Sequence, residues 1–262
     1  PIEWIEQQTT LKTAMLNDVL CISVDNAKHH NDSVNLPAGK SCPSALTCRA
    51  HVEIVNNTTK MTDGKFAITR CFSATSELRR DVYNICDYNF KMLRSCDGVN
   101  GMYDLLKRSI NTLDFKPFRI HDDGDFFNQK YFDAWVQFAI DSLENEKIFY
   151  AYTKSIPYWI NRINDIPKNL RLIASYGGVH DELIKKYNLI SARIIFHPDE
   201  ALKLNLPIDK HDNIAIRNNT DFCLLIHGTQ KAESKSSKAK AFLDREFKRT
   251  GDIRFKSSYT RK

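Results

Sequence analysis

Residues 117–127 constrain the fold more than any other stretch of this chain. The segment reads Pro-Phe-Arg-Ile-His-Asp-Asp-Gly-Asp-Phe-Phe, a short apolar strand followed by an acidic turn. Strand interiors rarely carry so much charge. Asn128 then offers the side chain of a helix N-cap, and apolar residues follow it at helical spacing. A strand, a charged corner and a helix form a βα unit, whose loop lies where ligands bind to parallel sheets.

The same alternation continues toward the C-terminus. Candidate strands are residues 19–24, 118–120, 148–152, 170–175, 192–196 and 222–226. Segments of crossover length separate most of the later strands, which predicts a parallel sheet. We therefore predict one α/β domain over residues 1–262, a partial (βα) barrel of about six mainly parallel strands. Its cysteine-rich N-terminal segment, residues 1–100, binds a cofactor, and residues 101–262 form regular βα units.

The predicted strands end in polar or glycine residues, which indicates one functional edge of the sheet. The candidate catalytic residues at this edge are His121, Asp122, Asp125, Tyr152 and Lys154. The carboxylates would bind an amine or hydroxyl group or accept a proton, and the lysine would pair with a carboxylate or phosphate. In a simpler interpretation, the acids cap nearby backbone groups and the lysine only neutralises them.

The chain contains seven cysteines, an odd number that argues against a disulfide framework and for an intracellular protein. Six of them lie in the first hundred residues. Cys42, Cys48 and Cys71 are candidate metal ligands, and no two cysteines have the close spacing typical of zinc sites. Soft thiolates on separate loops favour an iron–sulfur cluster, with 4Fe-4S as the preferred type. The alternative is that these are free buried thiols.

The fourth ligand is Cys96 in this hypothesis, provided that a second segment folds back toward the other three. A straight helix after Cys71 would carry Cys86 roughly 22 Å away, which disfavours that residue. Cys21 and Cys223 lie inside apolar strands. An open iron, or His121 as a ligand, is the alternative.

The net charge of +6 is modest, and part of it lies near the C-terminus. The basic residues of this region are Lys231, Lys235, Lys238, Lys240, Arg245, Lys248 and Arg249. Such a run is typical of a solvated helix face, and a weak nucleic-acid contact is the alternative. No apolar run approaches the roughly 20 residues that span a bilayer, and no secretory signal opens the chain. We therefore expect no membrane contact.

Several sequence blocks together resemble the phage gene product 88 family. They are residues 36–43 (Leu-Pro-Ala-Gly-Lys-Ser-Cys-Pro), Cys48, residues 71–74 (Cys-Phe-Ser-Ala), 119–126 (Arg-Ile-His-Asp-Asp-Gly-Asp-Phe), 149–155 (Phe-Tyr-Ala-Tyr-Thr-Lys-Ser) and 227–229 (His-Gly-Thr). The resemblance implies a phage protein, acting in the host cytoplasm, with a metal-bearing α/β architecture. The family holds its cysteines close together, whereas here 22 residues separate Cys48 from Cys71. Turn-forming residues within 51–70 predict an inserted hairpin that returns Cys71 to the same place.

Three cysteines near the mouth of a partial barrel also resemble, loosely, the radical S-adenosylmethionine enzymes. That likeness implies S-adenosylmethionine as a second cofactor, but the Cys-x3-Cys-x2-Cys motif is absent. We thus predict a phage-encoded iron–sulfur protein, with an unidentified small-molecule or nucleic-acid substrate if it is an enzyme. One alternative is a zinc- or magnesium-dependent nucleic-acid-processing protein. Another is a non-catalytic protein in which the cluster has a structural or redox role.

Overall fold

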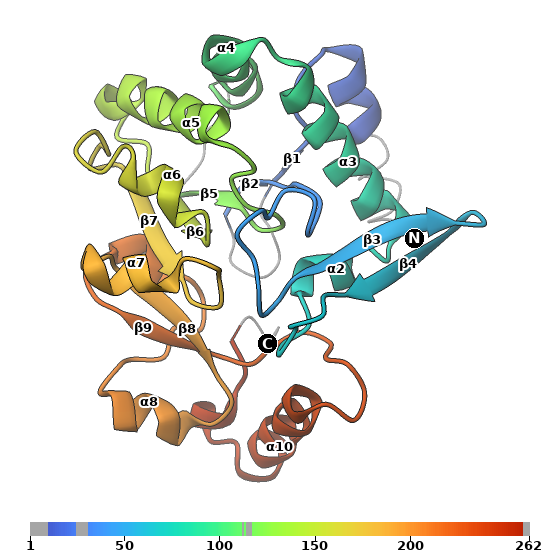
Figure 1. Ribbon diagram of the computed structural model, residues 1–262, viewed down its shortest axis with the longest axis vertical. Helices are drawn as coiled ribbons and strands as arrows, with labels where there is room; N and C mark the ends of the chain where they lie inside the picture. Colours follow the sequence, from blue (N-terminus) through green and yellow to red (C-terminus); the bar gives the residue numbers. More distant parts are fainter. Residues whose placement is uncertain (1–9, 25–30, 112, 114–116, 259–262) are drawn as a thin grey trace.

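The structure is a computed structural model that describes residues 10–24, 31–111, 113 and 117–258. Seven of its strands form one sheet, in the order β1-β2-β5-β6-β7-β8-β9, and two form a separate hairpin (Figure 1). The strands of the sheet are β1 (Ile22–Ser23), β2 (Ser33–Val34), β5 (Phe118–His121), β6 (Phe149–Thr153), β7 (Leu170–Ser175), β8 (Ser191–Ile195) and β9 (Phe222–Leu225). The hairpin consists of β3 (Ala50–Val55) and β4 (Thr58–Asp63).

The sheet is mostly parallel, as predicted. Only the β1–β2 pair is antiparallel, and each strand from β5 to β9 runs parallel to its predecessor. The sheet has seven strands in the described residues instead of the predicted six. The additional strand is β2, which has only two residues and therefore shows no alternating pattern in the sequence. The sheet is open, with β1 and β9 at its edges, so the described residues form no closed barrel.

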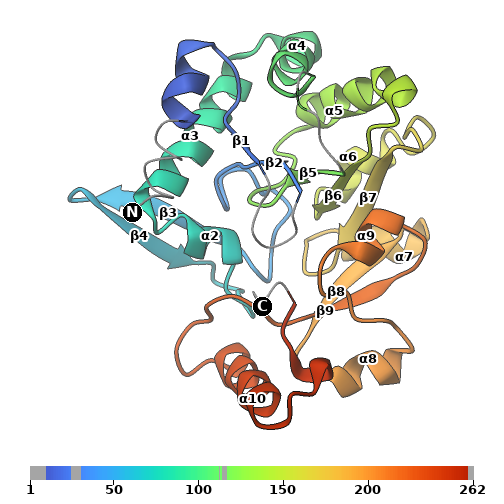
Figure 2. The same ribbon diagram turned by 180° about the vertical axis from the view of Figure 1, so that it is seen from behind.

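Helices cover both faces of this sheet (Figures 1 and 2). They are α2 (Phe72–Ser76), α3 (Arg80–Ser95), α4 (Gly98–Ile110), α5 (Gln129–Asp141), α6 (Ile156–Ile160), α7 (Asp181–Lys186), α8 (Pro198–Leu204), α9 (Asn213–Arg217) and α10 (Lys235–Thr250), with short 3-10 turns at Leu143–Asn145 and Ile253–Phe255. Residues 10–16 are also helical. Helix α5 begins as predicted, because the Asn128 side chain accepts a hydrogen bond from the Tyr131 N–H at 2.8 Å.

Alternate residues of each strand enter different cores. Phe149 and Ala151 of β6 pack with α4, α5 and α6, whereas Tyr150 packs with Ile173 of β7 and Ala215 of α9. This is the period of two that a strand imposes on its side chains. The larger core also includes residues from β1, β2 and α3, so the cysteine-rich portion and the later βα units share one core.

Helix α3 buries a face that mixes polar and apolar side chains. The residues that α3 buries are Asp81, Tyr83, Cys86, Asn89, Phe90 and Leu93.

Among the described residues, no helix is both long and apolar enough to cross a membrane.

Candidate functional site

Residues 36–48, the cysteine segment, lie across the carboxyl ends of β5 and β7. The Leu36 N–H donates to the carbonyl oxygen of Asp123 at 2.9 Å, and the N–H groups of Leu46 and Thr47 donate to the carbonyl oxygen of Gly177 at 3.1 and 3.0 Å. Gly177 has a φ of +97°, and a Cβ atom there would lie only 2.1 Å from the Thr47 hydroxyl oxygen. Only glycine allows this close approach. The cysteine segment therefore lies at the edge that the sequence predicted to be functional.

The β3–β4 hairpin leaves this edge after Cys48 and returns to it before Cys71. At its base, the Gly64 N–H donates to the Arg49 carbonyl oxygen at 2.6 Å. The Ile68 N–H then donates to the Thr47 carbonyl oxygen at 2.7 Å, beside Cys48. The predicted inserted hairpin is confirmed. Because the chain closes on itself at this base, the 22 residues between Cys48 and Cys71 do not separate the two cysteines in space.

The thiol groups of Cys42, Cys48 and Cys71 lie close enough to one another to interact electrostatically. Burial raises the pKa of the Cys42 thiol well above its ordinary value, and Asp125, Cys71 and Cys48 raise it further. Burial and Cys48 raise the pKa of Cys71 to about 12. Like charges nearby disfavour ionisation in this way. The Cys42 and Cys71 thiols would therefore become thiolates only beside a compensating positive charge.

Cys71 also lies next to the end of β9. The Arg70 N–H donates to the Gln230 side chain at 2.9 Å, and the Gln230 amide donates to the His227 carbonyl oxygen at 2.8 Å. The rings of Phe72 and His227 are 6.1 Å apart. Residues that flank the cysteines thus contact segments that follow three strands of the sheet.

Asp125 links the ends of β5 and β6 beside Cys42. Its buried carboxylate accepts hydrogen bonds from the Thr153 hydroxyl at 2.6 Å and the Lys154 N–H at 2.9 Å. It also accepts one from the N–H of the next residue, Phe126, at 2.7 Å. Burial raises the pKa of Asp125 above its ordinary value, although these hydrogen bonds act in the opposite direction. Asp125 therefore binds nearby backbone N–H groups, as the simpler interpretation of the acidic turn predicted.

Lys154 points its ammonium group toward β7 rather than into an acid. Its Nζ atom donates to the Ser175 hydroxyl oxygen at 2.6 Å. Within the described part of the chain, no carboxylate oxygen lies within 4.0 Å of this nitrogen. Lys154 therefore makes no close ion pair with the acidic turn in these residues, although its charge lowers the pKa of Asp125 in opposition to the effect of burial.

His121 and Cys96 do not join the other candidates. His121 is 2 % exposed, packs against Phe126 and hydrogen-bonds the Tyr131 hydroxyl at 3.1 Å. Burial lowers its pKa to about 3, so its imidazole is neutral. Cys96 follows the 16 residues of α3, about 24 Å of helix, and its thiol donates to the Met92 carbonyl oxygen. In the described residues, the contacts of Cys96 are thus with α3 and the larger core rather than with the cysteine segment, and its role as the fourth ligand stays a prediction.

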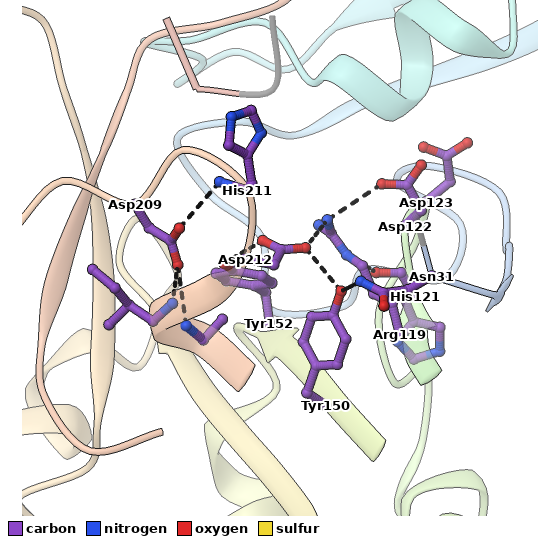
Figure 3. Close-up of polar contacts among 12 residues, drawn as sticks. Asn31, Arg119, His121, Asp122, Asp123, Tyr150, Tyr152, Asp209, His211 and Asp212 are labelled. Atoms are coloured by element: carbon purple, nitrogen blue, oxygen red, sulfur yellow. Dashed lines mark hydrogen bonds and ion pairs between the residues drawn. The ribbon is translucent and has the colours of Figure 1, made fainter. Parts of the chain in front are cut away.

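Tyr152 and Asp122 belong to a different buried network, centred on Asp212 (Figure 3). The Asp212 carboxylate accepts hydrogen bonds from the hydroxyls of Tyr150 at 2.9 Å and Tyr152 at 2.7 Å. Arg119 pairs with Asp212 at 2.8 Å and with Asp122 at 3.5 Å. The predicted catalytic set is thus divided between two networks. Sequence reasoning assigned no role to Arg119 or Asp212. A charged residue inside an apolar strand was the available signal for Arg119.

The described residues contain no group of three or more His, Cys, Asp or Glu side chains that could hold a metal ion. Cys21, Cys86 and Cys223 are buried core residues. Burial was expected for Cys21 and Cys223, which lie in apolar stretches predicted to be strands. The site therefore consists of three half-buried thiols, the carboxylate of Asp125 and the ammonium of Lys154.

Comparison with known proteins identifies the family. The chain is 29 % identical over 133 residues to the Gene 88 proteins of Mycobacterium phage D29 and Mycobacterium phage L5, matching 47 % of this chain and 47 % of each relative. It therefore spans about half the length of the curated relatives it matches. No solved structure matches, and no comparison shows a likeness to radical S-adenosylmethionine enzymes. Because the sequence model of gene product 88 matches residues 6–245, this chain belongs to the gene product 88 family of phage proteins.

Proposed function

We propose that this protein binds an iron–sulfur cluster of the 4Fe-4S type through Cys42, Cys48 and Cys71. One observation supports the proposal: the intervening hairpin closes at its base, so the segment that carries Cys71 returns beside the cysteine segment at the carboxyl edge of a parallel sheet. Buried thiols with raised pKa values ionise when a metal compensates their charge. Three thiolates fit a cluster that keeps one iron open.

Ligand softness and spacing favour a cluster over zinc in this proposal. Structural zinc draws four ligands to within about 2.3 Å of one atom. The sulfur ligands of a four-iron cluster stand farther apart, because each binds a different iron, and separate loops can supply them. The donor set of three cysteines on two loops suits the second arrangement.

When bound, the cluster would supply electron transfer or Lewis acidity at this edge. Asp125 would fix the ends of β5 and β6 beneath it, since two of its three hydrogen bonds come from Thr153 of β6 and from Lys154 directly after that strand. Lys154 would place positive charge beside the thiolates. S-adenosylmethionine as a cosubstrate stays a prediction, to be tested by its binding to protein that carries the cluster.

The magnesium-dependent alternative has less support from the acidic turn. Asp122 pairs with Arg119, whereas Asp125 binds Thr153 and the Lys154 backbone, so the two carboxylates have different partners. A nucleic-acid contact through α10 stays a prediction. Two of the basic residues of this helix, Lys240 and Arg249, form ion pairs with Asp244 and Glu246.

The proposal is tested on protein purified without oxygen, by absorption spectroscopy and by iron, sulfide and zinc analysis. We expect a broad band at about 400 nm, from charge transfer between thiolate and iron, with matched iron and sulfide. The triple variant Cys42→Ala/Cys48→Ala/Cys71→Ala should lose the band and the iron. The matched control, Cys96→Ala, also removes a half-buried thiol and should keep both.

Stoichiometric zinc without colour, lost in the triple variant, would replace the cluster with a zinc site. Protein with no bound metal at all would refute the proposal. Circular dichroism before and after iron chelation separates the remaining classes. Loss of folding with no cosubstrate binding would indicate a purely structural cluster.

A further inference from the structure

Lys154 and Ser175 form a polar pair between the ends of β6 and β7. Thr153 and Ala174 are partners in the parallel register of these strands, so the next residues, Lys154 and Ser175, emerge side by side. The Nζ atom of Lys154 donates to the Ser175 hydroxyl at 2.6 Å. The pairing of β6 with β7 therefore places Lys154 and Ser175 next to each other.

The Lys154 ammonium group has more N–H donors than acceptors among the described residues. A lysine ammonium carries three N–H donors, and among the described residues only Ser175 accepts one of them. The neighbouring carboxylate of Asp125 already accepts three hydrogen bonds. Charge that is removed from water requires a partner. Lys154 is half-buried and has no carboxylate within ion-pair distance in the described part of the chain, so it can accommodate an anion.

The serine adds a second donor. Its hydroxyl oxygen accepts from Lys154, and its own proton has no acceptor among the described residues. Gly177 and Gly178 follow in the same turn and present no side chains to the lysine. A Cβ atom on Gly177 would lie 3.7 Å from the Lys154 Cε, and one on Gly178 would lie 3.2 Å from its Cβ. The glycines instead let the cysteine segment approach the lysine, because the Thr47 hydroxyl oxygen would lie 2.1 Å from a Cβ on Gly177 and the Ser44 carbonyl oxygen 3.1 Å from one on Gly178.

We propose that Lys154 Nζ and Ser175 Oγ together bind an oxyanion, the carboxylate or phosphate group of a small-molecule ligand. The ligand would lie beside the cysteine segment, because Thr47 of that segment contacts Gly177. As a substrate or cosubstrate site this inference rests on the proposed cluster, but oxyanion binding itself requires no iron. Among the candidate catalytic residues, the proposal gives anion binding to Lys154 alone. Tyr152 and Asp122 belong instead to the Asp212 network.

The test measures thermal unfolding midpoints of iron-free and anaerobically purified protein against increasing inorganic phosphate or acetate. Chloride keeps the ionic strength constant. A ligand that binds only the folded state raises the midpoint with concentration, which gives an apparent Kd. Lys154→Met should weaken binding about 10- to 100-fold, the range for hydrogen bonds to charged groups. Lys185→Met, on the exposed face of nearby α7, makes the same charge change and should leave the affinity unchanged.

Ser175→Ala should weaken binding less than Lys154→Met, and Lys154→Arg should retain part of it, which keeps the test informative if the methionine variant does not fold. Stabilisation by phosphate alone assigns a phosphate ligand, and stabilisation by acetate alone assigns a carboxylate. An unchanged affinity in Lys154→Met, or no stabilisation by either anion, overturns the inference. Binding that depends on Lys154 in a protein that never acquires iron would refute the cluster while supporting the oxyanion site.

Discussion

Glu77 has its carboxyl group buried beneath the cysteine segment. The residue is 1 % exposed, and its Oε1 atom accepts a hydrogen bond from the Ala38 N–H at 2.6 Å. Its Oε2 atom has no hydrogen-bond partner among the described residues. Burial, with a contribution from Asp123, raises the pKa of Glu77 to about 8. The native state therefore keeps a proton that the unfolded chain releases near pH 4.5.

This proton makes stability fall as the pH rises. Between pH 4.5 and about 8 the native state binds one more proton than the unfolded state, so each pH unit costs up to about 1.4 kcal/mol of the free energy of unfolding. Glu77→Gln keeps a carbonyl acceptor for Ala38 and has no proton to lose. We expect the variant to gain stability over the wild type as the pH rises to 8, measured by urea unfolding.

Glu182→Gln, at an exposed position of α7, should leave the pH profile of the wild type unchanged. Parallel profiles for Glu77→Gln and the wild type would contradict a raised pKa at Glu77.

At the scale of elements, the β3–β4 hairpin brings Cys71 back to Cys48 through its base rather than its tip. Val52 pairs with Met61, and beyond this pair most residues are exposed. Replacing residues 53–60 with Asn-Gly closes the hairpin with a tight type I′ turn. We expect iron content to be unchanged and the free energy of unfolding to fall by less than about 1 kcal/mol, as for exposed residues in general.

The contrasting variant is Gly64→Val, at the hairpin base. A Cβ atom there would lie 2.7 Å from the Arg49 carbonyl oxygen, so the base must open. Iron content measured after anaerobic purification should fall in this variant only. Equal iron loss in the shortened hairpin would show that the tip takes part in the site.

The strands from β5 to β9 could be predicted from sequence because each is an apolar run bounded by turn-forming residues. The predicted bounds differ from the observed ones by one residue or less, as in β7, where Leu170–Ser175 was both predicted and observed. Strand β2 could not be predicted, since Ser33–Val34 is too short to show alternation.

The candidate site was only partly predictable. The turn signals around Asn56 and Asn57, which both adopt left-handed φ, correctly predicted the hairpin and so the approach of Cys71 to Cys48. Tyr152 and Lys154 were grouped because both end β6, although Tyr152 is directed to Asp212 and Lys154 to Ser175. Asp212 lies 93 residues from Arg119 in the chain. No local pattern indicates such a partner.

At the scale of the whole molecule, Asp212 joins the sheet to the segment before α9. Its fully buried carboxylate binds Arg119 of β5 and two tyrosines of β6. Asp212→Asn removes the charge that compensates Arg119, while asparagine tolerates the left-handed φ of 61° at this position. We expect the free energy of unfolding to fall by about 3 kcal/mol, because a buried ion pair loses one partner.

Asp165→Asn makes the same substitution in an exposed ion pair with Arg162 and should cost at most about 1 kcal/mol. Chemical unfolding of both variants at neutral pH provides the comparison. Equal costs would show that the Asp212 network does not stabilise the fold.

The position of the cysteine segment on the sheet has a consequence for the order of events during protein synthesis. Its anchors at Gly177 and Gln230 lie far beyond Cys71 in the chain, and each later strand pairs with its predecessor. At about 5–20 residues per second, a ribosome needs about 8–30 s to extend the chain from Cys71 to Gln230. During that interval the nascent thiols lack their final partners. Insertion of the proposed cluster is therefore expected after translation, once β7 and β9 have joined the sheet.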